Sequence, residues 1–365
     1  MGTRFDYIDA LRGYAILGVM IVHAGPCVDG LDVEATAWGA RGVQLFFVVS
    51  ALTLMTSWTE RSDGAQAFYI RRLFRIAPMF WLAIPFYLWL WGAGPSGYAP
   101  NGLSAWHVGM TAIFLHGLHP ETITSVVPGG WSVADEVLFY AIFPLVAAFL
   151  ATWMRAAMCT LAATGLAYLF WLTASSFVPL LFPNEPSNLL RTFAFLSFPL
   201  QVTAFTAGIL AFHSIRLARK RVPRWLIETV LVAAIALLVL RGYKRVYDVP
   251  AFGLLFAAVA TTMGLGAGGY LVNPVIRHIG KVSFSAYLIH VSLLGPAAAL
   301  AHSLGVRGAW GLAVILPAFV LATTIFATAT FLLIEQPAIS FGRRVVSWRL
   351  SARRGIGERL DALRP

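Results

Sequence analysis

The stretch Asp9-Ala-Leu-Arg12-Gly-Tyr-Ala-Ile-Leu-Gly-Val-Met-Ile-Val-His23 is an apolar run that is long enough to enter a membrane, and it contains two ionisable side chains within its length. Arg12 and His23 are separated by about three helical turns, with roughly 20° of offset. Both side chains are therefore predicted to project from one face of one helix, roughly 16 Å apart along its axis. Charged groups in a membrane span are costly and face protein or a water-filled cavity. This face is predicted to line a polar passage.

The composition is that of a membrane protein with many spans. Of the 365 residues, 59% are hydrophobic and only 12% are charged, and the mean hydropathy is +0.75. The net charge of +11 comes from basic residues between and after apolar runs, which indicates orientation in a membrane rather than a nucleic-acid partner. The two cysteines, Cys27 and Cys159, exclude a disulfide framework, and their spacing is not that of metal ligands.

Eleven apolar runs follow one another along the chain. The fourth is the weakest, because it is short and carries His107 and His116 between Gly and Pro residues. The runs are 8–25, 42–58, 73–92, 104–118, 133–153, 157–179, 192–213, 225–241, 249–271, 284–304 and 309–334.

The basic residues decide the predicted topology, because Lys and Arg concentrate in cytoplasmic loops. They follow the second, fifth, seventh and ninth runs and fill the tail, whereas the loop after the first run is acidic. The sequence thus predicts an all-α integral membrane protein with about ten spans, a re-entrant or interfacial helix at 104–118 and two cytoplasmic termini. Arg241, Lys244 and Arg245 fall on the outer side and disagree with this assignment. We expect no cleavable signal peptide, because Asp9 and Arg12 interrupt the first run.

This topology divides the polar residues of the spans into two groups. The outer group suits proton transfer, because a carboxylate can hold a histidine in the tautomer of a general base. The inner group suits a phosphate-bearing ligand, because Arg offers forked donors. The outer group is His23 and Glu136. The inner group is Arg12, Arg72, Arg75, Tyr287 and His290.

Each of these residues also has an ordinary structural interpretation. Arg71, Arg72 and Arg75 are compatible with membrane anchors, and Arg12 with a pair to Asp9 one turn away. His23 is compatible with a helix end at interfacial water, and Glu136 with a charge at a helix N-terminus. His116 and His119 have the spacing of a metal pair but lie among Gly and Pro residues, which argues against one.

Five stretches, in this order, resemble the membrane-bound acyltransferase 3 family. Arg12 and His23 match the family's Arg-x10-His pattern, Arg72 and Arg75 match its Arg pair, and Glu335-Gln-Pro337 resembles its closing Glu-x-Pro. The stretches are Tyr7 to His23, Gly42 to Ala51, Arg71 to Pro78, Trp131 to Tyr140 and Ser283 to His290. The chain departs from the family at Ala51, Val137 and Gln336, and we expect it to act without the soluble esterase-like domain that some relatives carry.

The resemblance implies an acyltransferase 3-like transmembrane domain at 1–340, followed by a basic cytoplasmic tail at 341–365 that lies along the anionic inner leaflet. It implies an O-acyltransferase of the bacterial inner membrane that moves an acyl group, most often acetyl, from cytoplasmic acyl-CoA to a sugar hydroxyl of a polysaccharide or lipopolysaccharide. His23, Glu136 and Arg12 would then be catalytic. Arg72, Arg75, Tyr287 and His290 would bind the acyl-CoA co-substrate, without a metal.

Three alternatives stay open at this stage. The acceptor could be a small molecule such as a macrolide, or a lipid. An anionic metabolite could instead be transported through the same passage without chemistry. A transporter has no need of a histidine three turns beyond Arg12 on the same face. Direct transfer and an acyl-histidine intermediate are both compatible with the sequence.

Overall fold

The protein is a bundle of helices. The computed structural model describes residues 5–61, 63–218, 222–244 and 248–361, and the side chains within them except those of 242–244 and 352–361. All regular elements in these ranges are helical, so the predicted all-α membrane architecture is confirmed. Eight segments are long and apolar enough to cross a bilayer: Asp6–Cys27, Glu34–Glu60, Gly64–Trp91, Gly130–Phe149, Trp153–Leu181, Ser187–Ala218, Ser283–Leu304 and Gly308–Ser351.

The longer helices are α1 (Asp6–Ala24), α3 (Gly42–Glu60), α4 (Gly64–Trp91), α6 (Gly130–Phe149), α7 (Trp153–Leu181), α9 (Phe198–Ala218), α10 (Arg224–Lys244), α15 (Gly308–Thr330) and α16 (Gln336–Asp361). The shorter ones are α2 (Glu34–Ala37), α5 (Ala105–Ala112), α8 (Ser187–Leu196), α11 (Val249–Gly264), α12 (Pro274–Lys281), α13 (Ser283–Ile289) and α14 (Leu294–Leu304). Single turns are η1 (Gly25–Cys27), η2 (Trp38–Arg41), η3 (His116–Leu118), η4 (Gly269–Leu271), η5 (His290–Leu293) and the π-helical η6 (Phe331–Glu335).

Two of the predicted spans lie outside these eight segments. The predicted runs 225–241 and 249–271 correspond to α10 and α11, of which α11 is an apolar helix of only 16 residues. The total of ten therefore stays a prediction. The predicted run 104–118 contains α5, a helix of eight residues. At 1.5 Å per residue it extends only about 12 Å, which is too short for a hydrocarbon core of about 30 Å.

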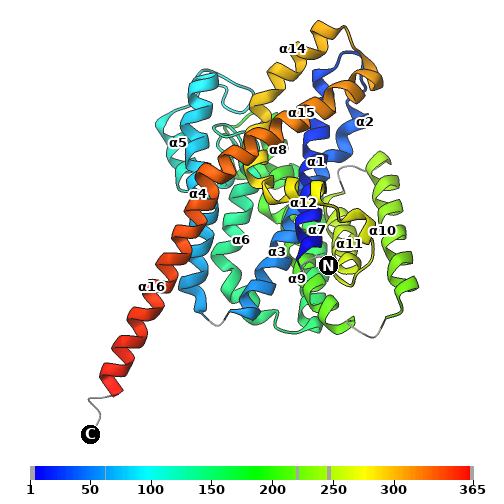
Figure 1. Cartoon of the computed structure of the whole chain (residues 1–365). Helices are drawn as coiled ribbons and strands as arrows, with labels where there is room; N and C mark the ends of the chain where they lie inside the picture. Colours follow the sequence, from blue (N-terminus) through cyan, green and yellow to red (C-terminus); the bar gives the residue numbers. More distant parts are fainter. Residues whose placement is uncertain (1–4, 62, 219–221, 245–247, 362–365) are drawn as a thin grey trace.

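Helix α1 lies at the centre of the bundle and packs against α3, α12 and η2 (Figure 1). Glycines allow the closest approach. A side-chain carbon on Gly280 of α12 would collide with the backbone oxygen of Asp9, and one on Gly13 of α1 with that of Ile276. Small residues at a helix contact let two backbones approach within a membrane. This contact fixes α12, and the α13 segment that follows it, against the first half of α1.

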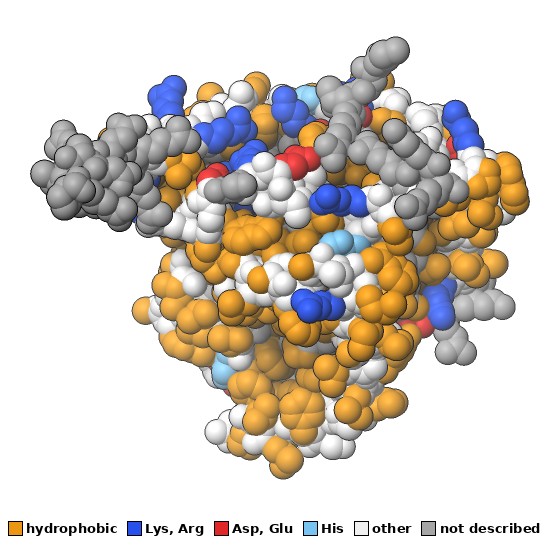
Figure 2. Space-filling model, turned by 90° about the horizontal axis from the view of Figure 1, so that it is seen from below, with side chains coloured by type: hydrophobic (Ala, Val, Ile, Leu, Met, Phe, Trp, Pro, Cys, Tyr) orange, Lys and Arg blue, Asp and Glu red, His pale blue; other side chains and the backbone are white. Residues whose placement is uncertain are grey.

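The two ends of the bundle differ. The ends of α3, α6 and α9 and the starts of α4, α7 and α10 lie at the lower end in Figure 1, and α16 projects downward away from the bundle. Figure 2 shows this end, with Lys and Arg side chains on its upper half and hydrophobic side chains over most of the rest. The sequence analysis assigns the α3–α4, α6–α7 and α9–α10 connections to the cytoplasm. It also assigns there the segment after the ninth run, which contains α12 and packs against α1.

Candidate active site

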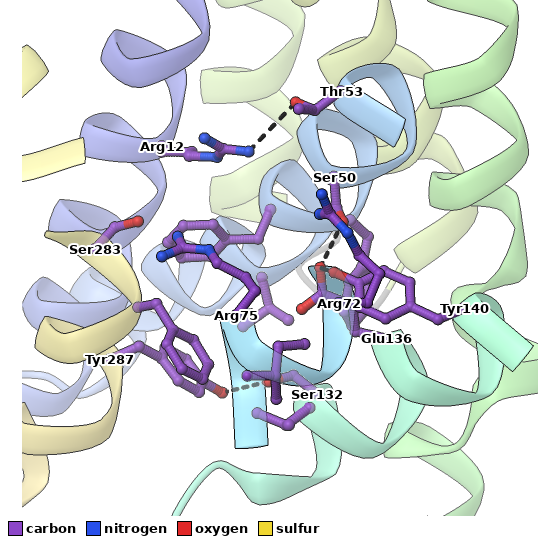
Figure 3. A pocket seen from close by; sticks show the side chains of 16 residues that line it. Arg12, Ser50, Thr53, Arg72, Arg75, Ser132, Glu136, Tyr140, Ser283 and Tyr287 are labelled. Atoms are coloured by element: carbon purple, nitrogen blue, oxygen red, sulfur yellow. Dashed lines mark hydrogen bonds between the residues drawn. The ribbon is translucent and has the colours of Figure 1, made fainter. Parts of the chain in front are cut away.

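A polar pocket lies between α1, α3, α4, α6 and α13, close to the centre of the bundle (Figure 3). Three arginines point into it from two helices, Arg12 from α1 and Arg72 and Arg75 from α4. Its other polar lining residues are Ser50, Thr53, Ser132, Glu136, Tyr140, Ser283 and Tyr287. We call this set the arginine pocket.

The Arg12 guanidinium has polar contacts with α3 and with its own helix. Its Nη2 donates to Thr53 Oγ1 on α3 at 3.3 Å, and its Nη1 lies 3.6 Å from Asp9 Oδ1 one turn earlier on α1. The pair with Asp9 that the sequence offered as an ordinary explanation is therefore present. It does not remove Arg12 from the pocket, because the guanidinium also reaches across to α3.

Arg72 and Arg75 occupy the pocket in different ways. Arg75 forms an ion pair with Glu335 of the π-helical turn η6, and Glu335 also accepts a hydrogen bond of 2.8 Å from Ser285. The guanidinium of Arg72 lies 5.9 Å from the rings of Phe68 and Tyr140, and its buried Nε has no hydrogen-bond partner in the described part of the chain. A buried donor without a partner is costly, so Arg72 is suited to an anion that enters the pocket.

The neighbouring Arg71 is not part of the pocket. Its two Nη atoms donate to both oxygens of Asp63, at 2.5 and 2.8 Å. The hydrogen bonds from Arg71, together with its positive charge, lower the pKa of this carboxyl below its usual range. Arg71 thus has a structural role at the start of α4, as the sequence allowed, whereas Arg72 and Arg75 turn inward.

Glu136 belongs to the arginine pocket and does not lie beside His23, its expected neighbour. Its Oε1 accepts hydrogen bonds of 2.5 Å from Ser50 and from Tyr140. The physical reason is the depth at which α6 begins. Residues 122–127, which precede it, include four buried side chains and are packed inside the protein. Glu136 therefore lies deeper in the bundle than it would if α6 began at the outer surface.

Tyr287 forms one wall of the pocket and holds α13 against α6. Its hydroxyl donates to Gly129 O and accepts from Ser132 Oγ, both at 2.9 Å. Gly129 has φ +72°, and a side-chain carbon there would collide with the Tyr287 ring. Glycine is thus required at this position both for conformation and for space.

His290 contacts His23, although the sequence analysis assigned it to the inner group. Its Nε2 lies 3.3 Å from His23 Nδ1, and the ring centroids are 5.0 Å apart. The reason is again the depth at which the helix begins. Because α12 packs against α1, Ser283 at the start of α13 already lines the pocket, and seven further residues carry the chain about 10 Å toward His23.

The contacts of this histidine pair assign its protons. His290 Nδ1 lies 2.7 Å from Tyr287 O, and His23 Nδ1 lies 2.8 Å from Val19 O. A carbonyl oxygen only accepts, so both Nδ1 atoms carry the proton in the neutral rings. His290 Nε2 is then an acceptor for the Nδ1–H of His23. The lone pair of neutral His23 is left on Nε2, which is the arrangement of a general base.

Tyr287 links the two sites. Its side chain lines the arginine pocket, and its backbone oxygen accepts the hydrogen bond from His290. The arginine pocket and the histidine pair thus lie along the same face of α1, with Arg12 at one level and His23 roughly 16 Å farther along. The first can bind an anion, and the second can take a proton.

His116 has a structural role, and His119 lies in the same loop region. Nε2 of His116 donates to Gly130 O at 2.9 Å, and its ring stacks on Phe80 at 5.5 Å. Burial lowers the pKa of His116 to about 4, so the ring is neutral and fixes the start of α6. Among the described residues, no group of three or more His, Cys, Asp or Glu side chains is placed to hold a metal ion.

Sequence reasoning missed several members of the pocket. Ser50 and Tyr140 bind Glu136, Thr53 binds Arg12, and Glu335 pairs with Arg75. Of these, only Glu335 carried a usable signal, because an acidic residue directly at the end of an apolar run and buried in the protein requires a partner. Hydroxyl side chains in spans commonly bond to their own helix, so Ser50 and Thr53 were not distinguishable from other residues of this kind.

Comparison with known proteins places these residues in a family. The family model described as an acyltransferase domain matches residues 5–332. Nodulation protein 10 of Rhizobium leguminosarum bv. viciae is 24% identical over 96% of this chain and 97% of its own length. The exopolysaccharide production protein ExoZ of Rhizobium meliloti (strain 1021) is 33% identical over 29% of this chain and 33% of its own length.

A third relative, from Staphylococcus aureus (strain MRSA252), carries the name "Putative O-acetyltransferase". It is 23% identical over 94% of this chain, and the match covers 59% of that longer protein. No solved structure matches the chain. The family match covers nearly the whole chain, including the arginine pocket and the histidine pair, and it sets aside the transporter interpretation. The protein belongs to the acyltransferase 3 family and is an integral-membrane acyltransferase.

Proposed function

We propose that the protein transfers an acyl group, acetyl in the simplest case, from cytoplasmic acyl-CoA to a hydroxyl of a cell-surface polysaccharide or lipopolysaccharide sugar. The observation that carries this proposal is the arrangement along one face of α1. An arginine-lined pocket lies at one level, and a histidine whose Nε2 lone pair is free lies at the other.

The arginine pocket supports a donor that carries phosphates. Arg12, Arg72 and Arg75 converge on one space, and the guanidinium fork matches phosphate oxygens. Arg72 is the best placed of the three, because its Nε lacks a partner while Arg75 is paired with Glu335. Coenzyme A carries phosphates at one end and its thioester at the other. Its slender arm would pass Tyr287 on the way from the pocket to His23.

Transfer then needs one proton acceptor. His23 Nε2 takes the proton of the acceptor hydroxyl as the oxygen attacks the thioester carbonyl carbon. The carbon–sulfur bond breaks, and the thiolate of coenzyme A leaves and takes the proton back from His23. In the variant with an acyl-histidine, Nε2 of His23 itself attacks the carbonyl carbon, and the carbon–sulfur bond breaks as the thiolate of coenzyme A leaves. The acceptor oxygen then attacks the acyl carbon, the bond to Nε2 breaks, and the hydroxyl proton passes through the freed Nε2 to the thiolate.

Two further residues receive roles in this scheme. His290 is a positioning residue, because its Nε2 accepts from His23 Nδ1 and so keeps the lone pair on His23 Nε2. Glu136 balances the positive charge of the arginine pocket, where its hydrogen bonds to Ser50 and Tyr140 hold it. Both assignments rest on the contacts of the two residues. The sequence analysis groups the residues by their expected depth in the membrane.

The acceptor is inferred from the relatives. One is named for exopolysaccharide production and one for nodulation, and a third carries an O-acetyltransferase name. These names support a glycan hydroxyl that is available at the outer side of a bacterial inner membrane. The basic loops at the lower end of the bundle support two cytoplasmic termini and a donor that enters from the cytoplasm.

A transfer assay with the full chain in lipid nanodiscs tests the proposal. The reaction contains acetyl-CoA labelled in the acetyl group and the polysaccharide fraction of the native host. We expect label to enter the glycan, together with release of free coenzyme A thiol. If the parental protein neither binds acetyl-CoA nor releases the thiol with any acceptor fraction, the proposed donor is wrong.

A further inference from the structure

A second cavity lies on the other side of α1 from the arginine pocket. It is lined by residues of α1, η2, α3, α10 and α11 and has a volume of about 730 Å³. Leu11 and Tyr14 of α1 line it, whereas Arg12, between them, lines the arginine pocket. The cavity is therefore separate from the proposed site of acyl transfer.

The lining of this cavity is apolar over most of its surface. Three side chains on one face of α10, Ile235, Leu238 and Val239, oppose Leu17 and Ile21 of α1. Arg41 is the one basic side chain among the described lining residues. This composition is typical of a site for an apolar molecule with a single polar end.

The cavity is open toward the surroundings of the protein. Helix α10 stands at the edge of the bundle and packs on α11 (Figure 1). Val239 and Trp38, which both line the cavity, are 68% and 47% exposed. In a membrane-spanning bundle, an opening between two helices faces the bilayer, so the molecules that meet it are lipids.

A hydrocarbon chain is the occupant that the physics favours. Apolar cavities do not hold water stably, because water needs two to four polar partners. An empty space of this size would deprive its lining of dispersion contacts. A lipid chain restores these contacts without the desolvation cost that a polar ligand would have.

Arg41 is the side chain that contacts the polar end of the occupant. Its side chain is 5% exposed, and its guanidinium lies 5.2 Å from the Phe195 ring and 6.0 Å from the Phe252 ring. The other ionisable lining residue at this end, Glu34, is exposed at the rim. An anionic oxygen that reaches past the rim therefore meets Arg41, and phosphodiester oxygens suit a guanidinium.

We propose that this cavity binds one acyl chain of a glycerophospholipid, with the lipid phosphate at Arg41. The site is independent of the acyl-transfer reaction, since the arginine pocket lies on the opposite face of α1. It holds a single bilayer lipid between α10 and the central helices, and the bound lipid fills the space that α10 leaves beside α1.

Substitution of one leucine on α10 tests the site. Leu238→Trp places a large ring in the cavity, whereas Leu240→Trp adds the same ring on the exposed face of the same helix. Each full-length protein is purified in mild detergent and titrated with palmitoyl-oleoyl-phosphatidylglycerol. Native mass spectrometry counts the bound lipids, and thermal melting confirms that each variant is folded.

We expect one tightly held lipid on the parental protein and on Leu240→Trp, and at least a tenfold weaker affinity for Leu238→Trp. Val259→Phe, which fills the cavity from α11, is a second variant and should act in the same way. Equal lipid binding by parent and Leu238→Trp would overturn the proposal. So would a parent that retains detergent alone, or one that forms a dimer through this face and holds no lipid.

Discussion

His23 and Arg72 present opposite chemical groups, and their neighbours account for the difference. The Nδ1–H of His23 is directed to Val19 O and His290 Nε2, so its remaining nitrogen offers a lone pair. Arg72 can only donate, and its buried Nε has no acceptor among the residues that the structure describes. One residue is thus prepared to accept a proton and the other to bind an anion, as an acyl transfer from a phosphate-bearing donor requires.

His23→Gln should abolish acyl transfer while donor binding remains. Glutamine keeps polarity and similar size but cannot act as a base near pH 7. Loss of a general base slows a reaction by about 10²–10⁴-fold, so we expect a loss of rate in this range with an unchanged dissociation constant for acetyl-CoA. His302→Gln, on the exposed surface of α14, is the control. Transfer by His23→Gln at the parental rate would rule out His23 as the base.

Arg72→Lys should weaken the binding of acetyl-CoA. Lysine keeps the charge but loses the fork that matches a phosphate. A hydrogen bond to a charged group contributes about 1.5–3 kcal/mol, which corresponds to about tenfold or more in affinity. Titration calorimetry with the purified protein measures the change.

The matched control is Arg71→Lys, one position earlier on α4, where the side chain binds Asp63 outside the pocket. Its affinity for acetyl-CoA should equal that of the parent. If both variants bind the donor like the parent, the arginines of this helix are anchors only.

Among the elements, the short and irregular ones position the site. The buried segment before α6 sets the depth of Glu136, and α12 sets the depth of His290 through its contact with α1. The π-helical turn η6 directs Glu335 to Arg75, and such turns occur frequently at functional sites. The segment before α6 and α12 lie between apolar runs, and η6 lies at the end of the last run. At these places hydropathy does not show the depth of a residue.

Gly280→Ala tests the contact between α12 and α1. The added methyl group would collide with Asp9 O, so α12 must move and carry Ser283 and Tyr287 away from the pocket. Overpacking of this kind costs about 1–3 kcal/mol. We expect a lower melting temperature in detergent together with weaker binding of acetyl-CoA. Gly295→Ala on α14, where nothing lies within 4 Å of the added carbon, should match the parent in both measurements. If the two variants behave alike, close packing at Gly280 is unimportant.

At the scale of the whole molecule, the sequence alone predicts the helical membrane architecture and part of the site. Membrane character, the all-helical fold and the shared face of Arg12 and His23 follow from hydropathy and helical periodicity. The neighbours of Glu136 and His290 did not follow, because the depth of a residue depends on where its helix starts. The depth of a residue cannot be obtained by counting positions from an assumed membrane surface when a segment such as 119–129 is packed inside the bundle.

The orientation of the bundle is the remaining prediction at this scale. The basic connections that follow α3, α6 and α9 share the lower end in Figure 1, and the positive-inside rule places that end in the cytoplasm. After replacement of Cys27 and Cys159 by Ser, a single cysteine is introduced at Gly94 in the α4–α5 connection or at Ala151 in the α6–α7 connection. Both positions are exposed. An impermeant maleimide added to intact cells should label Gly94→Cys at once and Ala151→Cys only after the membrane is opened. Labelling of both from outside, or the reverse pattern, would place the donor pocket at the wrong face of the membrane for cytoplasmic acyl-CoA.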